Sequence, residues 1–264
     1  MPSLPRVDLC GLEVSRLIIG GNPFSGFSHQ SPQRDEEMMD YYTVARIKET
    51  LARAEAAGIN TAIMRSDAHI HRLLREYRNE GGAIQWIAQV PGDRSSPDFQ
   101  VDARRAVAAG ARAAYLHGGL LDACFRDRDA DGFARLVALM RRGGVPVGTA
   151  GHSPEAHLWA YELGLPLDFH VVSFYNCGSL HDGKGEKFKA EDPPRAVAAI
   201  QQIEKPCIAY KIMAAGRVEP RAAFEYAFAH IKPGDCVNVG VYRGDRDDMV
   251  EENVRLVEEI LGGA

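Results

Sequence analysis

The chain has 264 residues, of which 45% are hydrophobic and 25% charged, and its formal net charge at pH 7 is -5. This composition is typical of a globular protein, and the length suits a single α/β barrel. Arg and Lys are scattered without a basic stripe, so we expect no nucleic-acid partner. No apolar run could cross a bilayer and the N-terminus lacks a signal-peptide pattern, so we expect a cytoplasmic protein with no membrane partner.

The five cysteines are odd in number, far apart, and contain no CxxC pair. Such a pattern argues against a disulfide framework, a zinc knuckle and an iron–sulfur cluster. We expect most of them to be small buried hydrophobic residues.

Short apolar runs alternate with amphipathic stretches along the whole chain. The run at 17–21 is followed, after a long connection, by a predicted helix over 44–58, and the run at 236–242 is followed by one over 249–261. In both helices the apolar residues recur at helical spacing. Eight strand-like runs are predicted, at 17–21, 60–64, 84–90, 111–117, 145–150, 169–175, 207–213 and 236–242.

Apolar strands that alternate with helices indicate a parallel sheet covered by helices. Eight such units over residues 1–264 predict one closed (β/α)8 TIM barrel, with an open doubly wound sheet as the alternative. Two connections are unusually long, 22–40 and 177–194, and we interpret them as lids over the site or as disordered loops.

Active sites of such barrels lie at the carboxyl ends of the strands, called the mouth below. Polar residues follow or end all eight predicted strands, so we expect them to converge there. They are Asn22, Arg65, Asp67, Gln89, His117, His152, Tyr175, Asn176, Lys211, Arg217, Tyr242 and Arg243.

Five stretches resemble the aldo/keto reductases, especially the bacterial branch of that family. They are GLEVSRLIIGGNPF (11–24), AAYLHGG (113–119), VGTAGHSPEAHLWAYELG (147–164), KPCIAYKIMAAG (205–216) and VNVGVYRGDRDDMVEENVRL (237–256). The resemblance implies a TIM barrel and carbonyl reduction by NADPH, in which a tyrosine gives the proton.

The family's catalytic tetrad is only partly matched. Its histidine corresponds to His117, but its aspartate falls on Ile63, its lysine falls on Gln89 or Val90, and no tyrosine stands in the next few residues after Ile63. The family's serine on the nicotinamide amide corresponds to Ala150. The resemblance therefore implies a divergent relative with a rebuilt site, in which Tyr175 or Tyr242 would have to donate the proton.

Candidate residues for an NADP or substrate phosphate follow the last two strands, where TIM barrels often bind phosphate. Arginine suits that role because its planar fork matches a phosphate. The candidates are Gly216, Arg217, Arg243, Gly244 and, in the region resembling the family's last helix, Asn253.

The remaining candidates support several chemistries. His117, Lys211 and Tyr175 are the proposed catalytic residues, with Lys211 stabilising an oxyanion or, alternatively, forming a Schiff base. Asn22, Asp67, Gln89, His152 and Asn176 are the proposed substrate-binding residues. His69 and His71 could join other histidines at a metal, but their spacing matches no known motif, so no metal ligand is assigned.

Three functions stay open. The first is an enzyme acting on a small polar carbonyl or sugar-like substrate, with NADP and a rebuilt site. The second is a non-redox isomerase, lyase or hydrolase in the same mouth, with or without a metal. The third is a non-catalytic binding or scaffold protein, which a mouth sealed by the 22–40 segment would favour.

Overall fold

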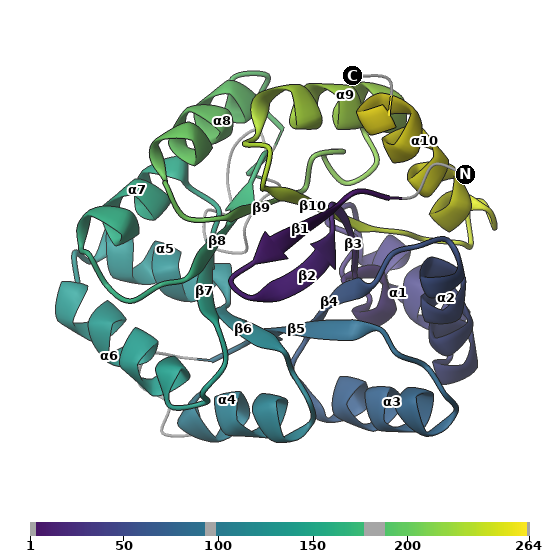
Figure 1. The fold of residues 1–264 in the computed structure, drawn as a ribbon, viewed down its shortest axis with the longest axis horizontal. Helices are drawn as coiled ribbons and strands as arrows, with labels where there is room; N and C mark the ends of the chain where they lie inside the picture. The colour runs from purple at the N-terminus through teal and green to yellow at the C-terminus, as the bar shows by residue number, and fades with distance from the viewer. Residues whose placement is uncertain (1–3, 93–98, 177–187, 263–264) are drawn as a thin grey trace.

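The computed structural model describes residues 4–92, 99–176 and 188–262. Within these residues, eight parallel strands close into a barrel in the order β10-β3-β4-β5-β6-β7-β8-β9, surrounded by helices (Figure 1). The closed (β/α)8 barrel is therefore confirmed, and the open sheet is excluded. The barrel strands are β3 (Leu17–Gly20), β4 (Thr61–Arg65), β5 (Gln85–Val90), β6 (Ala113–Leu116), β7 (Val147–Gly151), β8 (Phe169–Ser173), β9 (Cys207–Tyr210) and β10 (Cys236–Gly240).

The helices bury one apolar face against the outside of the barrel, as the periodicity predicts. In α2, Ile47, Leu51 and Ala54 are buried, and the Thr43 side chain caps the helix by accepting the Arg46 N–H. The helices are α1 (Pro32–Tyr41), α2 (Val44–Ala56), α3 (Ala68–Asn79), α4 (Phe99–Ala108), α5 (Gly118–Arg126), α6 (Ala130–Arg141), α7 (Pro154–Glu162), α8 (Asp192–Gln202), α9 (Pro220–His230) and α10 (Met249–Gly262). None of the described helices is long and apolar enough to span a bilayer.

An N-terminal hairpin closes the end of the barrel opposite the mouth. Strands β1 (Arg6–Leu9) and β2 (Leu12–Ser15) pair antiparallel. Leu9, Leu12 and Val14 belong to the same buried cluster as inward-facing strand residues such as Ile18 and Ile63. The hairpin lies across this end in Figure 1. Because one end is plugged, ligand access to the barrel is through the mouth.

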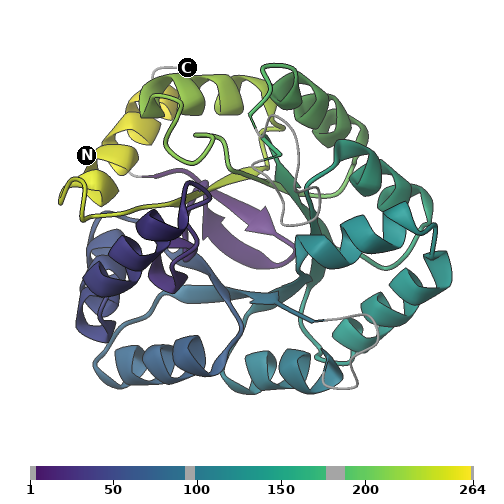
Figure 2. The same ribbon diagram turned by 180° about the vertical axis from the view of Figure 1, so that it is seen from behind.

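The 22–40 segment is not the single long loop that we expected. It contains a 3₁₀ turn, η1 (Pro23–Ser25), and most of helix α1. The Ser31 side chain accepts the Arg34 N–H, and Pro32 follows at the first helical position, where its missing N–H is not needed. Figures 1 and 2 show α1 on the face opposite the hairpin, which is the mouth side. Most of the other long connection, 177–194, lies outside the described residues.

Candidate functional site

Three histidines and a lysine gather at the mouth. His117 follows β6, His152 follows β7, Lys211 follows β9, and His29 comes from the turn between η1 and α1. The pKa of His29 is lowered to about 3, chiefly by burial, then by the charges of Lys211 and His152, with a smaller contribution from His117. The charges of Lys211, His152 and His117 all act on His29, so these four side chains lie near one another at the mouth.

His152 forms an ion-pair-like contact with Asp122 of α5. Its Nδ1 lies 2.7 Å from Asp122 Oδ2, its backbone N–H donates to Oδ1 at 3.0 Å, and the two side chains are only 11% and 17% exposed. Burial alone would raise the pKa of Asp122, but the hydrogen bonds from His152 outweigh it, and the pKa lies below its ordinary value. A carboxylate at Nδ1 holds the proton on that nitrogen, so Nε2 becomes the basic nitrogen of the neutral ring.

His117 has the complementary arrangement. It is the N-cap of α5, and its Nδ1 accepts the Gly119 N–H at 3.2 Å. Because Nδ1 acts as an acceptor, the proton of the neutral ring resides on Nε2, which makes that nitrogen a donor. A Cβ at Gly118 would come within 3.0 Å of His152 Cε1, so the glycine lets the two histidines approach. The mouth thus pairs one imidazole base with one imidazole donor.

Lys211 adopts an unusual backbone conformation immediately after β9. Its φ is +58°, a left-handed value that costs a non-glycine residue on the order of 1 kcal/mol. Its Nζ is buried and lies 5.5 Å from the centre of the Tyr210 ring. The same ring lies 6.3 Å from that of His152, and its hydroxyl donates to the Gly151 carbonyl at 3.3 Å. Tyr210 therefore contacts both the base and the lysine.

The segment after β3 covers part of this cluster. The Asn22 side chain lies 3.2 Å from His29 Nε2, and Gln30 Nε2 donates to the Ala215 carbonyl at 2.8 Å. The second contact joins the segment to the loop after β9. Two cavities in the described part of the chain lie elsewhere, one beneath α10 and one beside Cys10 and Asp168. The His29–Gln30 turn thus lies over part of the cluster at the mouth.

Replacing Gln30 with alanine should loosen this cover. The variant loses the hydrogen bond to Ala215, so amides of residues 22–31 should exchange with solvent faster, and small ligands should bind faster. Hydrogen exchange followed by mass spectrometry measures the effect, with Gln33→Ala on the exposed side of α1 as the control. Equal exchange in Gln30→Ala and the wild type would show that this contact does not hold the segment closed.

Four other predicted residues have structural partners near the mouth. Gln89 donates to the Tyr115 hydroxyl at 3.2 Å inside the barrel. Asp67 caps α3 by accepting the Ile70 N–H at 2.9 Å, and its other oxygen lies 4.0 Å from Arg65 Nε. Tyr175 packs 6.4 Å from the Phe188 ring, and Asn176 donates its backbone N–H to Asp192 at 3.2 Å. Their substrate-binding and catalytic roles stay predictions.

The predicted phosphate-binding residues do not form one cradle. Arg243 is buried, and its guanidinium donates to Glu49, to Asp247 and to the Thr50 hydroxyl, so every nitrogen of its fork already has an acceptor. Gly244 is exposed beside it. Gly216 has a φ of +82°, and Arg217 is exposed and stacks 3.8 Å over Phe188. Of these side chains, only that of Arg217 is placed to meet an anion without breaking ion pairs.

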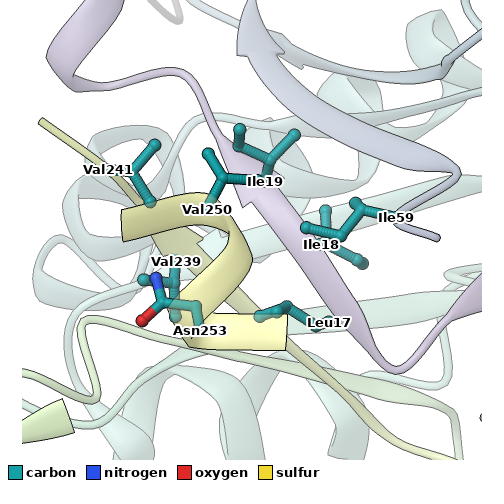
Figure 3. Close-up of a pocket in the computed structure, with 8 residues that line it drawn as sticks. All are labelled: Leu17, Ile18, Ile19, Ile59, Val239, Val241, Val250 and Asn253. Atoms are coloured by element: carbon teal, nitrogen blue, oxygen red, sulfur yellow. The ribbon is translucent and has the colours of Figure 1, made fainter. Parts of the chain in front are cut away.

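Asn253 lies in another environment, beneath α10. It is 7% exposed and lines a cavity of ≈ 10 Å³ between α10 and strands β3 and β10 (Figure 3). The remaining lining residues are apolar: Leu17, Ile18, Ile19, Ile59, Val239, Val241 and Val250. This space is barely large enough for one water molecule, so the described arrangement holds no cofactor group there. The fit of the predicted residues to NADP is therefore poor at both Arg243 and Asn253.

The described residues contain no cluster of His, Cys, Asp and Glu that could hold a metal ion. His69 is exposed on α3, whereas His71 lies 2.9 Å from the Ser66 hydroxyl, so these two do not share a site.

Sequence reasoning missed two members of the cluster, Asp122 and His29. Asp122 stands one turn into α5, a helix that starts directly at Gly118, where we expected only a connection. No Ser, Thr, Asp or Asn precedes Gly118 to mark a helix start, and His117 takes the N-cap position instead. His29 has a φ of +56°, and no sequence pattern predicts that conformation at a histidine.

No family model matches the sequence, and no curated protein matches it. The fold, however, matches solved structures. A Pseudomonas aeruginosa protein provisionally assigned as an aldo-keto reductase superposes with a TM-score of 0.67 at 20% identity, over 98% of both chains. The holo form of an aldo-keto reductase from Bacillus halodurans has a TM-score of 0.62 at 12% identity, over 98% of this chain and 91% of its own. A deoxyribose-phosphate aldolase from Coccidioides immitis, also a provisional assignment, has a TM-score of 0.52 at 13% identity, over 82% and 79%. These likenesses show an aldo-keto-reductase-like barrel, with low sequence identity.

Proposed function

We propose that this chain is an enzyme that transfers protons on a small polar carbonyl compound, such as a short sugar, at the mouth of the barrel. The observation that carries the proposal is the Asp122–His152 pair, which prepares a basic nitrogen at the same mouth as His117 and Lys211. Abstraction of a proton next to a carbonyl needs a base and a group that stabilises the developing oxyanion.

Each residue has a defined part in this reaction. His152 Nε2 removes the proton from the carbon beside the carbonyl, and Asp122 stabilises the imidazolium that forms. The His117 Nε2–H and the N–H groups of Lys211 Nζ stabilise the negative charge on the carbonyl oxygen. Return of the proton to the neighbouring carbon gives an isomer, whereas loss of a substituent gives elimination.

The test is a cofactor-free incubation of the purified protein with short aldoses and ketoses and their phosphates, followed by NMR detection of products. His117→Asn is the matched variant, because its side chain can still cap α5 but lacks the ring N–H. We expect turnover in the wild type and a large loss in His117→Asn. Equal product formation in the two proteins would exclude His117 from the chemistry.

Reduction of a carbonyl by NADPH is the second candidate, and the fold comparison supports it. The cofactor, when bound, would supply a hydride. A titration with NADPH, followed by cofactor fluorescence and by the melting temperature, tests this candidate, with Arg217→Ala and Arg243→Ala as variants. Saturable binding weakened by Arg217→Ala would support it, and absence of binding at millimolar NADPH would exclude it.

A further inference from the structure

The position of Lys211 suits a covalent role. It immediately follows β9, at the carboxyl end of a barrel strand, and its left-handed φ of +58° directs the chain away from the regular strand path at that point. The Nζ atom is buried at the mouth near His29, whereas the ammonium group of a lysine usually extends into solvent.

Burial matters because only the neutral amine of lysine attacks a carbonyl carbon. Removal of an ammonium group from water has a desolvation cost that the neutral amine largely avoids. His29 is uncharged at neutral pH, since its pKa is about 3, and the aromatic face of Tyr210 lies 5.5 Å from Nζ. Two of the groups near Nζ are therefore an uncharged imidazole and an aromatic ring.

The proton transfers that imine formation requires have candidate groups in the same cluster. A carbinolamine forms and dehydrates only if the nitrogen loses a proton and the oxygen gains protons. The basic Nε2 of His152 can accept a proton from the nitrogen and return it to the oxygen, while the Nε2–H of His117 stabilises that oxygen by a hydrogen bond.

We propose that Lys211 forms an imine with the carbonyl substrate, an inference that rests on the proposed function and specifies its mechanism. The Nζ lone pair attacks the carbonyl carbon, and the C=O π electrons move to the oxygen, which accepts a hydrogen bond from the His117 Nε2–H. His152 Nε2 accepts a proton from the nitrogen and passes it to that oxygen. His152 then transfers the second nitrogen proton to the oxygen in the same way. The oxygen leaves as water while the nitrogen lone pair forms the C=N bond, so that one amine and one carbonyl give one imine and one water with no net oxidation.

The imine would extend the reactions open to the site. Once protonated, it withdraws electrons from the neighbouring carbon more strongly than the carbonyl does, so His152 could remove the adjacent proton more easily. The same electron sink also supports cleavage of a carbon–carbon bond next to a hydroxyl group. The substrate class is therefore small hydroxy-aldehydes and hydroxy-ketones.

Borohydride trapping tests the proposal. The full-length protein is incubated with glycolaldehyde or dihydroxyacetone, treated with sodium borohydride, and examined by intact-mass measurement and peptide mapping. We expect one reduced adduct, located at Lys211, in most molecules before exposed lysines react. Lys211→Arg should abolish that adduct, whereas Lys205→Arg, at an exposed position, should leave it unchanged. Circular dichroism and melting establish that both variants are folded.

Two results would overturn the imine. One is an adduct spread over exposed lysines, and the other is trapping that persists unchanged in Lys211→Arg. Failure of the imine is distinguishable from failure of the proposed function. Isomerisation that depends on His117 without trapping at Lys211 would leave the proton transfer in place and assign Lys211 to charge stabilisation, whereas absence of both would reject both.

Discussion

Replacement of Asp122 by asparagine should lower turnover by about 10²–10⁴-fold, the range typical of a lost acid–base group. Asparagine has the shape of aspartate, and its oxygen can still accept the His152 backbone N–H. It carries no charge, however, and cannot stabilise the imidazolium or hold the Nδ1 proton in the same way. The loss should appear in kcat rather than in KM, because Asp122 contacts His152 and not the substrate.

The control is Asp131→Asn, an exposed carboxylate near the start of α6, which should keep full activity. His152→Gln should lose about as much activity as Asp122→Asn, and the double variant should lose little more, because the two residues act as a unit. An Asp122→Asn protein with wild-type kcat and an unchanged melting temperature would show that the pair is structural.

Acidification should destabilise the protein well before its carboxylates titrate. His157 and His170 are buried between α7 and the barrel, with their Nδ1 atoms 3.1 Å apart. Burial lowers the pKa of His157 to about 4 and that of His170 well below its ordinary value of 6.5. Since the unfolded chain binds protons at these histidines below pH 6.5 and the folded chain does not, stability falls as pH decreases.

The expected loss of stability on acidification is large. For His157 alone, a pKa lowered from 6.5 to about 4 corresponds to a free energy of unfolding reduced by on the order of 3 kcal/mol between pH 7 and pH 4. His170 and His29 act in the same direction. Asp122, whose pKa is lowered, contributes at still lower pH, because its stabilising charge is lost only as pH falls through its folded pKa.

Urea unfolding at pH 7, 6 and 5 measures this dependence. The double variant His157→Gln/His170→Gln should show a shallower loss of stability between these pH values, even though its stability at pH 7 is lower. An identical pH dependence in the variant and the wild type would contradict the assignment of the acid sensitivity to the buried pair.

The barrel itself could be predicted from the sequence, because strand burial leaves apolar runs and helix amphipathicity leaves a regular period. The run at 169–175 corresponds to β8, and the run at 236–242 corresponds to β10. Some predicted strands are longer than the observed ones, because apolar residues continue into the following turn. The predicted strand at 207–213, for example, extends beyond the end of β9 at Tyr210. Short α5 was missed because it starts without a loop, directly at Gly118.

The gathering of His117, His152, Lys211 and Asn22 could also be predicted, because each follows a parallel strand and all such ends share one face. The side chains from distant segments that contact these residues could not be predicted. The sequence placed Arg243 after the last strand. It did not reveal that the guanidinium of Arg243 would donate to Glu49, almost two hundred residues earlier in the chain. Nor did it reveal that Asp122 would reach His152 from another helix.

The central claim, that the mouth transfers protons on a carbonyl substrate, is tested most directly by solvent deuterium exchange. Glyceraldehyde and dihydroxyacetone are incubated in D₂O with the wild type and with His152→Gln, without a nicotinamide cofactor, and the signals of protons beside the carbonyl are followed by NMR. We predict that the wild type removes these signals much faster than buffer does, and that His152→Gln does not. Exchange at the rate of buffer in both proteins, while either compound is shown to bind at the mouth, would contradict the account and indicate a barrel that binds without catalysis.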